Sequence, residues 1–337
     1  MPLNLPHDIQ RLPPHIHPGH VLLRHAANLP HPLEQTSSWH GMYHLMPGVW
    51  IATAVFLSAI LASFYGVLVY RLPAIFGVTF TEYARTRKDT TIMDRSHCDS
   101  CDRILNVVDL IPVIGWLIRR GKCPDCGSPI PAVYPIIEGI AGIVGGILLY
   151  LSDGNFIPVF IASWLFLIAW MDDKTQWLPD GLWIPVMFTA LLLPLFGWSP
   201  VSLSSAIGGF ALGWALLFVV FGAISLLRQE DLMNYADIWL FASLLGLVGY
   251  EAAPLFVGGT ALLTIPYIAF MKLRARFTGS ELEYVNGQAD SVSASELDEN
   301  DMEEWSLGIP MAPLMCLCAT ILMSIEFIRN IPFSLPG

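Results

Sequence analysis

The feature that most restricts the fold of this chain is a series of apolar segments, each about twenty residues long. Such a segment crosses a bilayer as one α-helix, because lipid offers no partner for an unpaired backbone N–H or C=O group. Of the 337 residues, 54% are hydrophobic and 13% are charged, so the chain is far more apolar than an average soluble domain. We therefore expect an all-α polytopic membrane protein with eight transmembrane helices. The predicted spans are 48–71, 133–151, 156–172, 182–198, 203–227, 237–251, 254–271 and 309–328.

Lys and Arg residues indicate the orientation of these spans, since cytoplasmic loops carry an excess of both. If the N-terminus lies outside, the cytoplasmic segments are 72–132, 172–181, 228–236 and 272–308. Of the 17 basic residues, only three lie beyond these segments and their edges, and they are Arg11, Arg24 and Arg329. The asymmetry predicts this topology.

Three hydrophilic parts of the chain are predicted to carry no chemistry. Residues 1–47 are rich in Pro and His and read as a disordered tail, although a metal-binding His tract is the alternative. Met42 or Met46 would also serve as a start, and the first span is expected to be retained because no cleavable signal pattern precedes it. Residues 329–337 form a C-terminal tail.

The third part is an acidic cytoplasmic loop, 273–307. Nine acids and no bases lie between Glu281 and Glu304. A solvated, partly disordered loop is expected, and attraction of a basic substrate segment is the alternative. Nothing in the sequence suggests a nucleic-acid partner.

Four cysteines between the first two spans predict a metal site. Cys98 and Cys101 form one Cys-x-x-Cys pair, and Cys123 and Cys126 form a second pair after a gap of 21 residues. Two such pairs at this separation are typical of one tetrahedral, structural Zn²⁺ site. A cytoplasmic loop argues against disulfides, although redox pairs and simple buried thiols are alternatives. We call residues 72–132 the cysteine module. Cys316 and Cys318, in the last span, are expected to pack as small apolar residues.

Two aspartates at the cytoplasmic edges of different spans are candidates for catalysis. Asp172 ends the third predicted span and Asp237 begins the sixth. Ionisable residues in membrane helices are costly and usually functional, and two carboxyl groups brought together can share a proton and activate one water. Asp180 is expected to cap the following helix or to line the site, and Glu138 to line the site, bind the substrate amine or lie at the interface. Asp173, Glu230 and Asp231 are expected to face solvent.

From residue 48 onward, the order of these motifs resembles that of the type IV prepilin peptidases. Residues 63–73 are similar to the end of the first span in that family, and Tyr134-Pro135-x-x-Glu138 to its start of the second. The spacing of Asp172, Pro179 and Asp180 is similar to the first catalytic motif, and 309–313 to the opening of the last span. The second catalytic motif, Gly-x-Gly-Asp, has Asn234 and Ala236 in place of both glycines.

The resemblance implies a membrane aspartic endopeptidase of the bacterial inner membrane, with Asp172 and Asp237 as catalytic residues facing the cytoplasm. Residues 133–328 would then form a seven-helix peptidase domain. The implied substrates are prepilins or pseudopilins, cleaved between a basic leader and an apolar helix, with pilus or secretion machinery as further partners. N-methylation by S-adenosylmethionine is implied by the family alone, because no Gly-rich nucleotide loop is present. The alternatives are a non-catalytic zinc-bearing assembly scaffold and a cation-coupled transporter.

Overall fold

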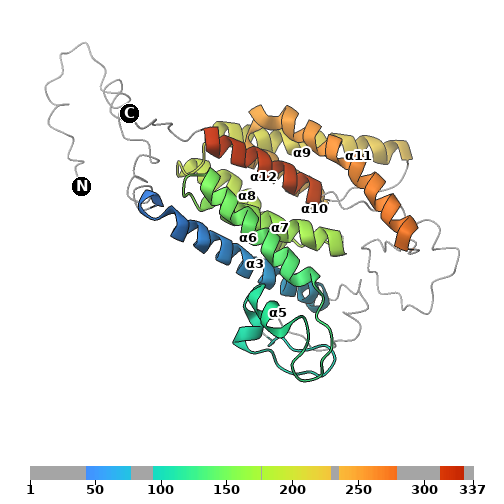
Figure 1. The fold of residues 1–337 in the computed structure, drawn as a ribbon. Coiled ribbons are helices and arrows are strands. Elements are labelled where there is room, and N and C mark those ends of the chain that lie inside the picture. The colour runs from blue at the N-terminus through green and yellow to red at the C-terminus, as the bar shows by residue number, and fades with distance from the viewer. Residues whose placement is uncertain (1–42, 77–93, 176, 229–234, 279–311, 330–337) are drawn as a thin grey trace, which may run out of the picture.

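Figure 1 shows a computed structural model of the chain, which describes residues 43–76, 94–175, 177–228, 235–278 and 312–329. Eight long helices make up most of the described residues. They are α3 (Pro47–Ile75), α6 (Val133–Leu151), α7 (Ile157–Thr175), α8 (Asp180–Leu195), α9 (Leu203–Arg228), α10 (Tyr235–Val248), α11 (Ala253–Thr278) and α12 (Ala312–Arg329). The predicted N-terminal tail up to residue 42, most of the acidic loop and Asn234 lie outside the described residues, as do Glu230 and Asp231.

Each of the eight helices coincides with one predicted apolar span, which confirms the helical membrane-protein class. By length and composition, the described residues include three helices that could each cross a membrane, namely Pro47–Pro73, Val133–Leu151 and Leu203–Leu227. α10 and α11 together form a fourth candidate, but the pair is bent by 105° at the short 3₁₀ helix η4 (Tyr250–Ala252). α8 and α12 are apolar but shorter, and α7 ends in three charged residues, Asp172, Asp173 and Lys174.

The core of the bundle lies where α7, α8, α10 and α12 meet. α10 is the central helix, because every residue from Leu240 to Val248 is buried. A helix that is apolar on all sides is kept from water either by other helices or by lipid, and α10 is enclosed by helices. α9 packs along α10 and leaves most of its own surface exposed, as expected of a helix facing lipid.

α3 and α6 form a second, closely packed pair (Figure 1). Gly145 shows why they can approach, because a Cβ atom at this position would lie 2.0 Å from Oγ of Ser58 on α3. Small residues of this kind are the usual contact between membrane helices, where packing rather than the hydrophobic effect drives association.

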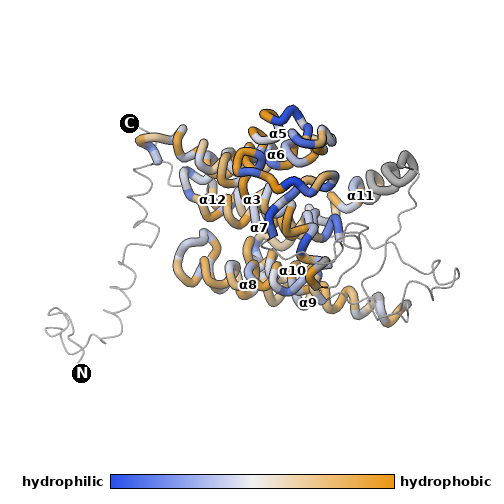
Figure 2. The backbone as a smooth tube through the Cα atoms, turned by 90° about the horizontal axis from the view of Figure 1, so that it is seen from below, coloured by the Kyte–Doolittle hydropathy of each residue, from blue (hydrophilic) through white to orange (hydrophobic). Residues whose placement is uncertain are grey.

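Residues 72–75 of the predicted cysteine module belong to α3, and residues 94–132 of the module lie beyond one end of α3 and α6 (Figure 1). The module contains a short 3₁₀ helix, η3 (Val107–Leu110), and a six-residue helix, α5 (Ile114–Arg119). Figure 2, seen from the module side, shows hydrophilic segments gathered in this module and near α7, and mostly apolar helices elsewhere. The module therefore differs in composition from the bundle that carries it.

Candidate active site and metal centre

The two Cys-x-x-Cys pairs fold into matching turns. In the first turn, the N–H of Cys98 donates to the carbonyl of Arg103 and the N–H of Asp102 donates back to Cys98. The second turn repeats both bonds, from Cys123 to Ser128 and from Gly127 to Cys123. The residue after each second cysteine, Asp102 or Gly127, has a positive φ, which closes the turn and points two thiols to the same side.

The four sulfur atoms have the spacing that a tetrahedral metal requires. All lie within 4.8 Å of one another, and the closest pairs are Cys98–Cys126 at 3.8 Å and Cys101–Cys123 at 3.9 Å. Four thiolates at about 2.3 Å from a central zinc would stand about 3.8 Å apart, because that is the edge of such a tetrahedron. The residues present therefore fit a Cys₄ metal site.

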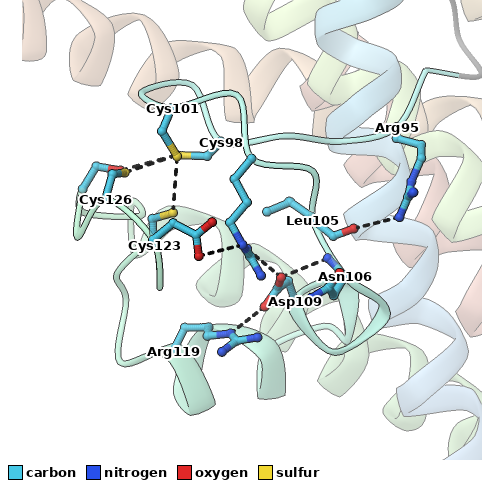
Figure 3. A network of polar contacts seen from close by, with 12 residues as sticks. Arg95, Cys98, Cys101, Leu105, Asn106, Asp109, Arg119, Cys123 and Cys126 are labelled. Atoms are coloured by element: carbon cyan, nitrogen blue, oxygen red, sulfur yellow. Dashed lines mark hydrogen bonds and ion pairs between the residues drawn. The ribbon is translucent and has the colours of Figure 1, made fainter.

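An ion-pair network centred on Asp109 supports the two turns (Figure 3). Asp109 on η3 accepts from the guanidinium groups of Arg103 at 2.9 Å and Arg119 at 2.6 Å, and from the N–H of Asn106. Arg103 also pairs with Asp125 in the second turn at 3.2 Å. Burial opposes the charge of Asp109, but these three donors outweigh it and hold the pKa of the carboxyl below its usual value.

Asp109 was not among the predicted site residues. Its signal in the sequence was its place in the Asp109-Leu110-Ile111-Pro112 segment between the two cysteine pairs, which by itself assigns no role. The structure shows that it joins both turns to α5 through arginines.

Glu138 connects the cysteine module to α6. Its Oε2 atom accepts a 2.7 Å hydrogen bond from the N–H of Val113, just before α5. Val113 has φ 59° and ψ −50°, and the N–H of Ile114 donates to the carbonyl of Pro112 across it, which is a strained γ-turn for a β-branched residue. Glu138 thus stabilises an unfavourable backbone conformation, and this contact gives the glutamate a structural position at the base of the module.

Asp172 lies in the last turn of α7, where only 6% of its surface is exposed. Its Oδ2 atom accepts a 3.0 Å hydrogen bond from the backbone N–H of Ala312, the first residue of α12. The first N–H groups of a helix lack partners within that helix and carry partial positive charge, so they favour a carboxylate. The start of α12 therefore holds Asp172 in position.

Asp237 lies in the first turn of α10 and is half-buried. Its carboxyl group is close enough to that of Asp172 for the two to interact electrostatically. α12 packs against both α7 and α10, so one helix contacts the two elements that carry the aspartates. The structure thus juxtaposes the two aspartates that the sequence singled out, across 65 positions of the chain.

The other carboxylates at this end of the bundle are engaged locally. Asp173 pairs with the neighbouring Lys174 at 3.0 Å and is partly exposed, in agreement with the expected solvent-facing position. The expected capping role of Asp180 is wrong, because α8 begins at Asp180 itself and Pro179 occupies the cap position. The helix starts two residues before the predicted span, so the carboxyl lies inside the first turn.

Asp180 is instead connected to the first turns of α10 through Trp183. Its Oδ1 atom accepts a 3.0 Å hydrogen bond from the indole N–H of Trp183, and Trp183 stacks on Trp239 with ring centres 5.5 Å apart. Trp239 is two residues beyond Asp237, so this chain of contacts connects α8 to the turn that carries the second aspartate.

Ala236, one of the two residues that replace family glycines, belongs to α10 and is not among the residues with positive φ. No glycine is needed at a helical position with negative φ. Cys316 and Cys318 are buried free thiols on α12, as predicted.

Comparison with known proteins assigns the chain to a family. Residues 56–152 match the family model of the bacterial peptidase A24 N-terminal domain, and residues 159–269 match that of the type IV leader peptidase family. A prepilin leader peptidase/N-methyltransferase of Klebsiella pneumoniae is 30% identical over 212 residues, which cover 62% of this chain and 89% of that protein. The protein of the same name from Burkholderia pseudomallei (strain 1026b) is 28% identical over 250 residues, 69% of this chain and 81% of that protein. No solved structure matches significantly. The chain belongs to the type IV leader peptidase family.

Proposed function

We propose that this protein is a membrane aspartic endopeptidase that removes the basic leader from type IV prepilins or pseudopilins. The observation that carries the proposal is the juxtaposition of Asp172 and Asp237 in a member of the type IV leader peptidase family. Several relatives are named for prepilin leader cleavage, which supports the choice of substrate.

The proposed mechanism needs only the two carboxyl groups and one water. Two neighbouring carboxyl groups share one proton, because both cannot readily be ionised. The charged member takes a proton from water, whose oxygen attacks the scissile carbonyl, while the protonated member donates to the carbonyl oxygen. The carboxyl group that took a proton from water then donates it to the leaving nitrogen, the C–N bond breaks to release the amine, and the other carboxyl group takes back its proton as the carbonyl re-forms. The backbone N–H of Ala312 keeps Asp172 oriented through these steps.

We propose that the eight long helices all cross the bacterial inner membrane, with the N-terminus outside and the aspartate pair at the cytoplasmic face. The distribution of Lys and Arg supports this orientation. The 14 residues of α10 span about 21 Å, so this helix needs a locally thinner bilayer or a contribution from η4.

We further propose that Cys98, Cys101, Cys123 and Cys126 hold one structural Zn²⁺. A closed Cys₄ site leaves no position for a reacting water, so the metal would supply folding energy to the module rather than chemistry. N-methylation of the new N-terminus with S-adenosylmethionine is the second activity in the relatives' names. We expect it to accompany cleavage, with pilus or secretion machinery receiving the product.

The decisive experiment is cleavage of a matched prepilin by the purified full-length protein in lipid. We expect removal of the leader without added metal, and mass spectrometry of the product will show whether the new N-terminus is methylated. An intact prepilin under conditions where a characterised relative cleaves its own substrate would favour the non-catalytic scaffold. Ion flux coupled to a gradient in the same liposomes would favour a transporter.

A further inference from the structure

The cysteine module exposes an apolar face that a water-soluble module would not be expected to carry. Ile114, Leu117 and Ile118 lie on one side of α5, since they are spaced three and four residues apart. Leu117 is 59% exposed and Ile118 is 56% exposed. Val107 and Leu110 on the adjoining η3 are also exposed. Adjacent large apolar residues on a surface usually mark an interaction with a partner or a membrane.

Val113, the residue before α5, contacts α6 and places the start of α5 near one end of that helix. α6 has 19 residues and is about 28 Å long, close to the thickness of a hydrocarbon core. Val113, immediately before α5, contacts Glu138 and lies 3.9 Å from where a Cβ of Gly139 would be. These positions are in the second turn of α6, about 8 Å from its start. α5 therefore begins beside the second turn of α6 and not beyond the N-terminal end of that helix.

The apolar face of α5 also borders the outward surface of α6. Val133, Ile136 and Ile140 form one exposed apolar face of that helix. Gly139 is next to Ile140 and three residues from Ile136, so Val113 touches the edge of this face. The start of α5 therefore lies beside the exposed apolar face of α6, which faces lipid where α6 crosses the membrane as proposed.

Two exposed basic residues follow α5 in the sequence. Arg120 and Lys122 are exposed, and within the described part of the chain neither forms an ion pair, whereas Arg119 is held by Asp109. The acids Asp99, Asp102 and Asp125 belong to the two cysteine turns instead. Apolar side chains beside unpaired bases match the chemistry of an anionic membrane interface, where phosphate groups lie above acyl chains.

We propose that α5 is a membrane-surface anchor, with Ile114, Leu117 and Ile118 in the acyl boundary of the leaflet and Arg120 and Lys122 at anionic lipid phosphates. The anchor would fix the cysteine module against the membrane at the end of α3 and α6. The inference rests on the proposed topology for the membrane crossing of α6 and for the identity of the leaflet, and it does not depend on peptidase activity.

A lipid-quenching experiment on the full-length protein in nanodiscs tests the anchor. An environment-sensitive fluorescent amino acid is introduced at Leu117, and in a matched variant at Ser100, an exposed residue of the first cysteine turn. Zinc content and prepilin cleavage are measured separately to verify each variant. We expect lipids with a quencher near the headgroup to dim the Leu117 probe at least about twofold, and aqueous iodide to dim only the Ser100 probe. If labelling at Leu117 prevents folding, the probe is placed at Ile118.

Two outcomes would overturn the proposal. Quenching of the Leu117 probe by iodide to the same extent as the Ser100 probe would place α5 in water. Protection of the Leu117 probe from both quenchers would mean that another protein segment covers the face. Where the lipid quencher is effective, Arg120→Glu combined with Lys122→Glu should reduce its effect in phosphatidylglycerol nanodiscs more than in phosphatidylcholine nanodiscs.

Discussion

In the helix bundle the large apolar side chains Leu240, Leu244 and Phe256 are fully buried, whereas Leu117 and Ile118 in the cysteine module are more than half exposed. The module is too small to enclose a core, so its order depends on four convergent thiols and on the arginines around Asp109. The bundle depends on close packing, and it can therefore keep a carboxyl group such as Asp172 buried and fixed. The difference matches the two proposed roles, in which the bundle holds the reacting groups and the module is a metal-stabilised attachment.

The largest expected effect comes from removing the proposed metal site. Replacing Cys98, Cys101, Cys123 and Cys126 with Ser should lower bound zinc from about one ion per chain to about none, because no other set of described residues offers four such ligands. Metal analysis of the purified protein measures this. The control is Cys316→Ser with Cys318→Ser, which should keep its zinc; unchanged zinc in the fourfold variant would refute the assignment.

Removing either aspartate should stop the reaction without affecting the fold. Asp172→Asn and Asp237→Asn each keep the shape of the side chain but remove the proton exchange, so prepilin cleavage should fall by about a thousandfold or more. Initial rates on a matched prepilin measure the loss. Asp173→Asn is the control and should cleave normally, since Asp173 is partly exposed and pairs with the neighbouring Lys174. Near-normal cleavage by Asp237→Asn would exclude that residue.

The contribution of each ion pair to the stability of the cysteine module should increase with its burial. Asp109→Ala leaves Arg103 and Arg119 without their shared acceptor, and we expect the module to lose about 2 kcal/mol of local stability. Hydrogen exchange of the amides between residues 106 and 119 measures the loss. Asp125→Ala is the matched comparison, because its side chain is 61% exposed and its pair with Arg103 should contribute little. Equal effects of the two variants would contradict this account.

A backbone substitution tests how α12 positions Asp172. Ala312→Pro removes the one N–H that Asp172 accepts, while proline suits the first position of a helix. Loss of this hydrogen bond should lower kcat about tenfold, equivalent to about 1.4 kcal/mol. Ala312→Gly keeps the N–H and serves as the control. An unchanged kcat in the proline variant would show that Asp172 is held by its own helix alone.

The smallest effect is expected where the chain departs from the family motif. Ala236→Gly restores a glycine at a helical position that does not need one, so it should cost roughly 0.5–1 kcal/mol of stability and leave cleavage unchanged or slightly lower. Cleavage rates and thermal unfolding measure both. A tenfold gain in rate would mean that Ala236 strains the natural site.

The sequence by itself determined the features that depend on local pattern. Eight apolar runs predicted eight helices, because helix formation in lipid follows from length and apolarity alone. The paired Cys-x-x-Cys turns predicted a four-sulfur cluster, since each turn is built from neighbouring residues. The positions of Asp172 and Asp237 at span edges, together with the family resemblance, indicated a catalytic pair.

Only the tertiary structure decided which groups meet across the chain. The N–H of Ala312 reaches Asp172 over 140 positions, and a backbone donor leaves no trace in residue identity. Asp109 and Glu138 gained their structural roles from arginines and a strained turn that the fold brings to them. The expected cap at Asp180 failed because a shift of two residues in a helix start moves a side chain from the cap into the first turn. For Asp172 and Glu138 the physical reason is that packing between separate segments sets the contact, and no single segment encodes it.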